Sequence, residues 1–136
     1  MNALRRAVLR TVRLAELYAL CPPVPCEKGC SDCCGPVPFS RSEWARTGLP
    51  ESAAVQTPAL PGAFLAGKGE SVETLVCLFR EDGRCTIYAD RPFICRLYGC
   101  GPGLACAKGR SPKLPLSETA MALLARMYQQ IVREEA

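Results

Sequence analysis

The sequence predicts a small α+β fold in which two terminal helices pack around a loop-rich, cysteine-rich middle that contains a short β-hairpin. Segments with a helical periodicity of apolar residues stand near both ends, at residues 2–20 and 117–134. All 12 prolines and all 11 glycines lie between these segments and predict turns and loops there. The pair Asp82-Gly83 is a strong hairpin signal. The length of 136 residues suits one domain, which we expect to span residues 1–136.

The first predicted helix covers residues 2–20 and ends before Pro22 and Pro23. Its apolar residues recur every three or four positions, so we expect one stripe of the helix to face the core. The arginines of this segment occupy a different face. The stripe expected to face the core consists of Leu4, Val8, Thr11, Val12, Ala15 and Tyr18.

A second, shorter helix is predicted after residue 40. Ser40 and Glu43 have the spacing of a capping box, and Gly48 is a natural end point. Residues 49–71 hold three prolines and three glycines. We expect this stretch to be a connecting loop or a weak helix without a functional motif.

A β-hairpin is predicted in the middle of the chain. Residues 72–79 favour a strand, the sequence Glu-Asp-Gly-Arg at 81–84 favours a turn, and residues 85–88 favour the returning strand. Asp90 then has the character of a helix cap, with Pro92 in the first turn of the helix.

This short helix is expected to end at Gly99, and residues 101–116 are expected to form a loop. Ser117 predicts the start of the last helix. The stripe of that helix expected to face the core consists of Ala120, Leu124, Met127, Tyr128 and Ile131.

The absence of histidine from the sequence excludes several kinds of active site. A Ser-His-Asp triad, a Cys-His nucleophile pair, an HExxH zinc protease site and any histidine-ligated metal are ruled out. The P-loop and GxGxxG patterns are missing as well. We identify no catalytic constellation, and the sequence leaves open whether the protein is an enzyme.

Charge and hydropathy indicate which classes of partner and which cellular location to expect. The net charge is +4, and most of it lies in the first 20 residues, so we expect a solvated basic helix face and no nucleic-acid partner. We expect no membrane span, because no apolar run reaches the roughly 18 residues that one needs. Arg10, Arg13 and Glu16 interrupt any signal-peptide core. We therefore expect a cytoplasmic protein with reduced thiols.

Ten cysteines carry the chemical signal of this sequence. Residues 26–34 read CEKGCSDCC, in which Cys30 and Cys33 form a chelating pair with two residues between them. Cys21 and Cys106 are expected to be structural, and each cysteine of the later block, taken alone, could be an inert core residue. The metal ligands predicted from both blocks are Cys26, Cys30, Cys33, Cys34, Cys77, Cys85, Cys95 and Cys100.

Together the two blocks resemble the CxxCxxCC cysteine-cluster (YkgJ-like) family, which is proposed to chelate zinc or iron. The resemblance spans about residues 26–100 and includes DGRCTIY at 82–88 and RPFICRLY at 91–98. The first two cysteines here are separated by three residues, whereas the family usually has two. The resemblance implies a small cytoplasmic metal-binding domain and no established reaction.

All-sulfur ligation suits zinc or an iron–sulfur centre, and the sequence leaves the choice between them open. Four thiolates leave such a centre with a charge of about −2. Arg91 and Arg96, near Cys95, are candidates to offset it, and the alternative for Arg91 is a surface position or a pair with Asp90.

Three functions remain open from the sequence. The preferred one is a metal-binding protein with a structural, sensing or electron-transfer role. The second is a thiol–disulfide redox protein, although the chain shows no thioredoxin-like βαβ pattern around its CxxC. The third is an adaptor that binds another protein through its basic first helix and holds a purely structural metal.

Overall fold

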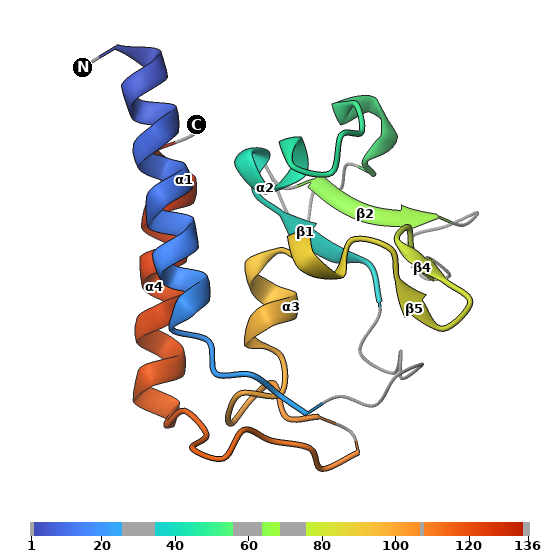
Figure 1. Cartoon of the computed structure of the whole chain (residues 1–136), viewed down its shortest axis with the longest axis vertical. Helices are drawn as coiled ribbons and strands as arrows, with labels where there is room; N and C mark the ends of the chain where they lie inside the picture. The colour runs from blue at the N-terminus through green and yellow to red at the C-terminus, as the bar shows by residue number, and fades with distance from the viewer. Residues whose placement is uncertain (1, 26–34, 56–63, 69–75, 107, 135–136) are drawn as a thin grey trace.

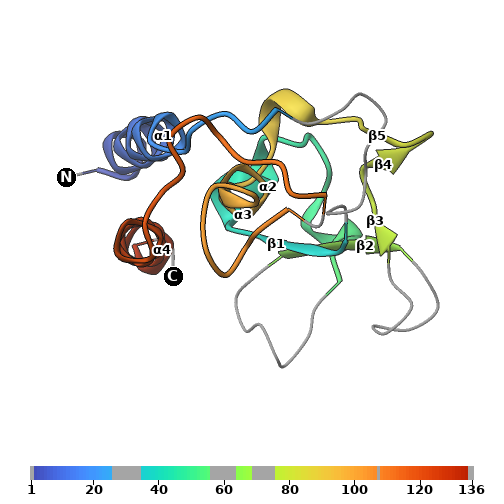
Figure 2. The same ribbon diagram turned by 90° about the horizontal axis from the view of Figure 1, so that it is seen from below.

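The fold has a helical side and a sheet side, which meet at a short central helix. We describe a computed structural model, which covers residues 2–25, 35–55, 64–68, 76–106 and 108–134. Helix α1 (Ala3–Ala19) runs antiparallel to α4 (Glu118–Arg133), and the two lie side by side in both views (Figures 1 and 2). Helix α3 (Phe93–Leu97) packs between this pair and the sheet. The predicted packing of the two terminal helices is confirmed.

Helix α1 forms where it was predicted, but a different face is buried. The Asn2 side chain caps it by accepting a hydrogen bond from the Arg5 backbone N–H. The buried residues are Leu14 and Leu17, which pack on α3 and α4. Of the stripe predicted to face the core, only Tyr18 packs against this cluster, and Leu4 is exposed. The prediction of the face was wrong because both faces of this helix carry apolar residues, and only the position of α3 and α4 decides between them.

Helix α4 confirms the prediction for the C-terminal segment. The Ser117 hydroxyl accepts a hydrogen bond from the Ala120 backbone N–H and starts the helix. The buried face is rotated slightly from the predicted one, since Met121 lies in the core and Met127 is partly exposed. The other core residues, Leu124 and Ile131, are those predicted.

Helix α2 (Arg41–Ala45) begins with the predicted capping box. The Ser40 hydroxyl accepts from the Glu43 backbone N–H, while the Glu43 carboxylate accepts from the Ser40 backbone N–H. Trp44, which follows, is buried in an aromatic cluster with Phe39, Phe64 and Phe79. This cluster is the core of the sheet side.

The three-stranded antiparallel sheet contains a strand that the sequence analysis missed. Strand β1 (Val37–Phe39) pairs with β2 (Phe64–Lys68), and β2 pairs with β3 (Val76–Cys77). Strand β2 falls in residues 49–71, which were predicted to be a loop or weak helix. Its apolar run is too short to show a period, and burial against the aromatic cluster decides its conformation.

The hairpin turn is where the sequence places it, between β4 (Arg80–Glu81) and β5 (Arg84–Cys85). Asp82 and Gly83 both have positive φ, 50° and 71°, as a type I′ turn requires. The strand predicted at 72–79 is shorter than expected. Its first four residues lie outside the described ones, Val76 and Cys77 form β3, and a turn at 78–79 leads into β4. The predicted returning strand at 85–88 ends at Cys85, and a 3₁₀ turn follows at Tyr88–Asp90.

Helix α3 begins two residues later than predicted. Pro92 is the N-cap residue, whereas Asp90 closes the preceding 3₁₀ turn and pairs with Arg46 at 3.3 Å. Gly99, at a φ of 84°, follows the end of the helix as expected. The described residues of 101–116 contain neither helix nor strand, which confirms the predicted loop.

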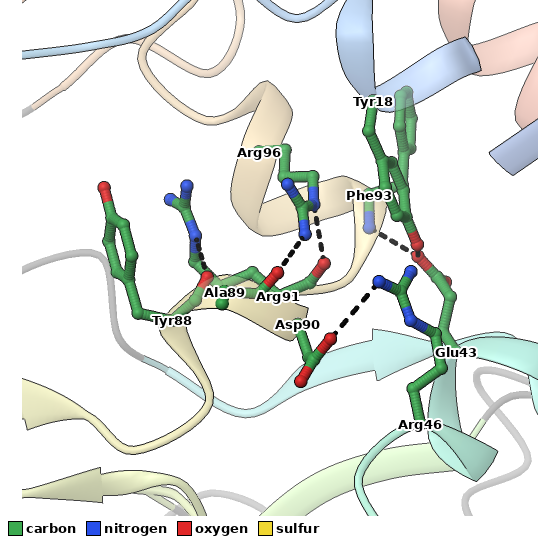
Figure 3. Close-up of polar contacts among 9 residues, drawn as sticks. All are labelled: Tyr18, Glu43, Arg46, Tyr88, Ala89, Asp90, Arg91, Phe93 and Arg96. Atoms are coloured by element: carbon green, nitrogen blue, oxygen red, sulfur yellow. Dashed lines mark hydrogen bonds and ion pairs between the residues drawn. The ribbon is translucent and has the colours of Figure 1, made fainter. Parts of the chain in front are cut away.

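The buried carboxylate of Glu43 joins the two sides of the fold. Its side chain accepts hydrogen bonds from the Tyr18 hydroxyl on α1 and from the backbone N–H of Phe93 at the start of α3 (Figure 3). It also accepts one from the Tyr128 hydroxyl on α4. With the Ser40 N–H it has four donors, two for each oxygen. A residue that is 1% exposed therefore keeps its polar atoms satisfied and links three helices to α2.

Candidate metal centre

The cysteines that follow α3 lie beside the chain segment that leads into the first cysteine block. The Cys100 side chain is fully buried, and its Sγ lies 3.3 Å from the carbonyl oxygens of both Pro22 and Arg96. A Cβ atom built on Gly99 would lie 3.3 Å from the side chain of Val24. Residues 22–24 are therefore packed directly against residues 99–100.

The other end of the first cysteine block is held by the same region. Strand β1 starts at Val37, soon after the block, and contacts α3, which carries Cys95. Cys26, Cys30, Cys33 and Cys34 themselves lie outside the described residues. The described residues on both sides of them contact the segment 93–100.

Cys21 is a neighbour of Cys100. Its Sγ donates to the Leu17 carbonyl at 3.8 Å, and its side chain packs against the helical core. Burial first and Cys100 second raise the pKa of Cys21 to about 11, against the opposing effect of Arg96 and Arg91. This raised pKa favours the neutral thiol of Cys21 at neutral pH.

A second pair of cysteines lies on the sheet side. Cys77 on β3 is buried in the aromatic cluster, and Cys85 on β5 packs against that cluster. Burial raises the pKa of Cys85; a backbone hydrogen bond at Ile87 opposes this, Cys77 adds to it, and Arg91 opposes it. The two thiols therefore belong to the same cluster of packed side chains.

Arg91 influences both pairs, because it favours the thiolate at Cys21 and at Cys85. Its Nε donates to the Tyr88 carbonyl at 3.0 Å, and its guanidinium lies 3.8 Å from the centre of the Tyr88 ring. Figure 3 shows the two side chains next to each other, on the side away from Asp90 and Arg46. Asp90 pairs with Arg46, and the Arg91 side chain contacts Tyr88 instead.

Arg96 holds the backbone that precedes α3. Its Nε donates to the Arg91 carbonyl and a terminal nitrogen donates to the Ala89 carbonyl, both at 2.8 Å (Figure 3). Its guanidinium also lies 4.1 Å from the centre of the Tyr18 ring. Burial lowers the pKa of Arg96, and Tyr18 opposes that change. The side chain thus fixes the turn that carries Arg91 and lies close enough to affect Cys21.

The described residues do not make a complete metal site on their own. Six cysteines are described, and each of them is a thiol outside any disulfide: Cys21, Cys77, Cys85, Cys95, Cys100 and Cys106. Within the described part of the chain, no three cysteine or carboxylate side chains come close enough to hold one ion. Their chemistry suits zinc or iron, and a site with three or more protein ligands needs residues from outside this set.

Residues 25–112 match the sequence profile of the CxxCxxCC family, described as a proposed zinc- or iron-chelating domain. The match covers well over half of the chain. The chain belongs to the CxxCxxCC family. Chelation of zinc or iron is the function that the family's description gives, and the match includes all eight predicted ligands.

No curated protein and no solved structure matched this CxxCxxCC chain in the comparisons. Among its described helices, none is long and apolar enough to cross a membrane.

Sequence reasoning missed two features around the candidate site. Glu43 was recognised only as a capping residue, although its carboxylate also anchors α3 through the Phe93 N–H. The proximity of Cys21 to Cys100 was missed because the two segments are far apart in the sequence. The Cys100 thiol contacts the carbonyl of Pro22, the residue after Cys21, from 78 positions away. No local sequence signal marks either contact, since both depend on how α1, α2 and α3 pack.

Proposed function

We propose that this CxxCxxCC protein binds zinc or an iron–sulfur centre through thiolates from both cysteine blocks. The predicted ligands are those of residues 26–34 together with Cys77, Cys85, Cys95 and Cys100. The observation that carries the proposal is the packing of residues 22–24 against Gly99 and Cys100, combined with the contact between β1 and α3. The chain segments before and after the first cysteine block are thereby held beside the second block.

The incomplete ligand set of the described residues supports the same conclusion. Cys77 and Cys85 belong to one cluster of packed side chains, and they lack a third ligand among the described residues. Additional thiolates from residues 26–34 would complete a site of the kind that zinc and iron–sulfur centres occupy. A site assembled from two distant blocks would contribute to folding as well as to binding.

The arginines near the thiols favour a negatively charged metal–thiolate centre. A centre with four thiolates carries a charge of about −2, which a neighbouring guanidinium stabilises. Arg91 acts on thiols of both described pairs, and Arg96 fixes the turn that carries Arg91. We infer a structural, sensing or electron-transfer role in a reducing compartment such as the cytoplasm, where thiols persist.

The test is the metal content and visible spectrum of protein purified without air. We expect a stoichiometric metal: a colourless protein with zinc, or a brown one with iron and sulfide and broad absorption near 400 nm, roughly as thiolate-bound clusters show. Protein that is folded and metal-free under these conditions, with rapidly alkylated thiols that cycle through disulfides, would instead support the redox alternative.

Substitutions then locate the ligands. Cys33→Ser and Cys95→Ser are expected to lower the bound metal, whereas Cys106→Ser, at a cysteine predicted to be structural, is the matched control. Equal metal content in all three variants would contradict the proposed ligand set. Loss of metal only in Cys33→Ser would exclude Cys95 as a ligand.

A further inference from the structure

Helix α1 has a second apolar face, which the fold leaves exposed. Leu4, Val8 and Val12 follow one another at intervals of four residues and are 73%, 54% and 47% exposed. They form one stripe along the helix, because residues four apart lie above one another. Leu14 and Leu17, which are buried, occupy the opposite side. We call the stripe Leu4–Val8–Val12 the outer face of α1.

The first half of α1 extends past the helix that supports the second half. Arg13 forms an ion pair of 2.6 Å with Glu134, which follows the last residue of α4. Residues 2–9 are all exposed, and among the described residues they belong to neither core cluster. Figure 1 shows these N-terminal turns beyond the end of α4. The extension, residues 2–9, is roughly 12 Å long at about 1.5 Å per residue.

This extension is uniformly basic. It carries Arg5 and Arg6, Arg10 follows it directly, and the first acidic residue of the chain is Glu16. Arg5 lines a shallow hollow together with Leu4, Val8 and Leu9. Arg5 lies at the border of the outer face, whereas Arg6 and Arg10 lie on another side of the helix, because successive residues are rotated by about 100°. A surface that matches the outer face must therefore be apolar in its centre and acidic where it meets Arg5.

We propose that the outer face of α1 binds in an apolar, acid-rimmed groove of a partner protein. Anchors at positions i, i+4 and i+8 are the pattern by which an amphipathic helix occupies such a groove. A second copy of this chain would place arginine beside arginine, which opposes self-association. A lipid surface is less suited, because the stripe is narrow and has no aromatic residue to insert at the interface. This inference does not depend on the metal.

The experiment is site-specific photocrosslinking of the full chain in cells of its source. A benzophenone amino acid replaces Val8, and the same amino acid at Leu114, which is 83% exposed and lies outside the helices, is the control. The captured protein is then purified and titrated with the unmodified chain at low and high salt. The variants Val8→Asp and Arg5→Glu are compared with Leu114→Asp, and circular dichroism verifies that all of them are folded.

We expect a protein captured from Val8 and not from Leu114, which binds about tenfold or more weakly to Val8→Asp and loses affinity with salt. Arg5→Glu should weaken binding in the same direction, and Leu114→Asp should leave it unchanged. The proposal is overturned if Val8 captures nothing, captures only a second copy, or captures a protein whose affinity is unchanged by Val8→Asp. Retention of the wild-type chain, and not of Val8→Asp, on phosphatidylglycerol vesicles would assign the face to a lipid surface instead.

Discussion

The Tyr18 hydroxyl on α1 donates a 2.5 Å hydrogen bond to the buried carboxylate of Glu43 on α2. The same carboxylate receives the Tyr128 hydroxyl of α4 and the backbone N–H of Phe93 at the start of α3. One acidic side chain thus holds together the terminal helices and the short helix that carries Cys95. We therefore expect the loss of this hydrogen-bond network to destabilise the protein and to shift the second cysteine block.

We expect Glu43→Gln to lower the free energy of unfolding by about 3 kcal/mol. The NH₂ group of glutamine would replace one carboxylate oxygen, and the two donors that this oxygen now serves would lose their acceptor. Urea unfolding measures the change. Glu51→Gln is the matched control, since Glu51 is an exposed carboxylate paired with Arg41 and should contribute less than about 1 kcal/mol. A Glu43→Gln protein as stable as the control would show that the network is dispensable.

Stability should fall at alkaline pH. Burial, the Glu43 charge and the hydrogen bond to it raise the pKa of Tyr18 and Tyr128 well above the usual range. Above about pH 10 the unfolded chain loses these protons while the folded chain keeps them. The folded state then binds more protons, so the free energy of unfolding decreases as pH rises.

The variant Tyr128→Phe tests this cause directly, because it removes one of the two partly buried phenols. We expect a shallower decline in its free energy of unfolding above about pH 10 than in the wild type. Tyr88→Phe, at an exposed tyrosine outside the network, is the control. Identical slopes for wild type and Tyr128→Phe would contradict the assignment.

The backbone at Gly101 leaves no room for a side chain. A Cβ atom there would lie 2.5 Å from the Leu116 carbonyl oxygen and 3.0 Å from Cγ of Met121. Gly101→Ala should therefore destabilise the protein by about 1–3 kcal/mol, since main chain and core must both shift. Gly35→Ala, where nothing lies within 4 Å, should be close to neutral, and thermal unfolding compares the two. Equal melting temperatures would mean that the approach at Gly101 is readily relieved.

Removal of the proposed metal should destabilise the fold. A chelator added under reducing conditions is expected to lower Tm, because the binding free energy of a site built from two blocks is also folding free energy. Readdition of the metal should restore the original Tm. A folded protein whose Tm is the same with and without bound metal would separate chelation from folding.

Local chemistry in the sequence was sufficient for the starts of α2 and α4 and for the hairpin turn. Ser40, Glu43 and Ser117 cap helices through hydrogen bonds to residues three positions away, so the signal and its partner are close in the chain. The Asp82-Gly83 pair provides the positive φ angles of its turn. The cysteine motif that places the chain in the CxxCxxCC family is equally readable, because it consists of residue types and spacings.

Only the tertiary structure decided which apolar surfaces are buried and which distant residues meet. The apolar stripe that helical periodicity selects on α1 is the exposed one, since burial depends on where α3 and α4 lie. Strand β2 exists because of its partners β1 and β3, which no local pattern in residues 49–71 reveals. The four donors of Glu43 come from residues as far apart as Tyr18 and Tyr128, and their shared need for a buried acceptor is met only when the chain is folded.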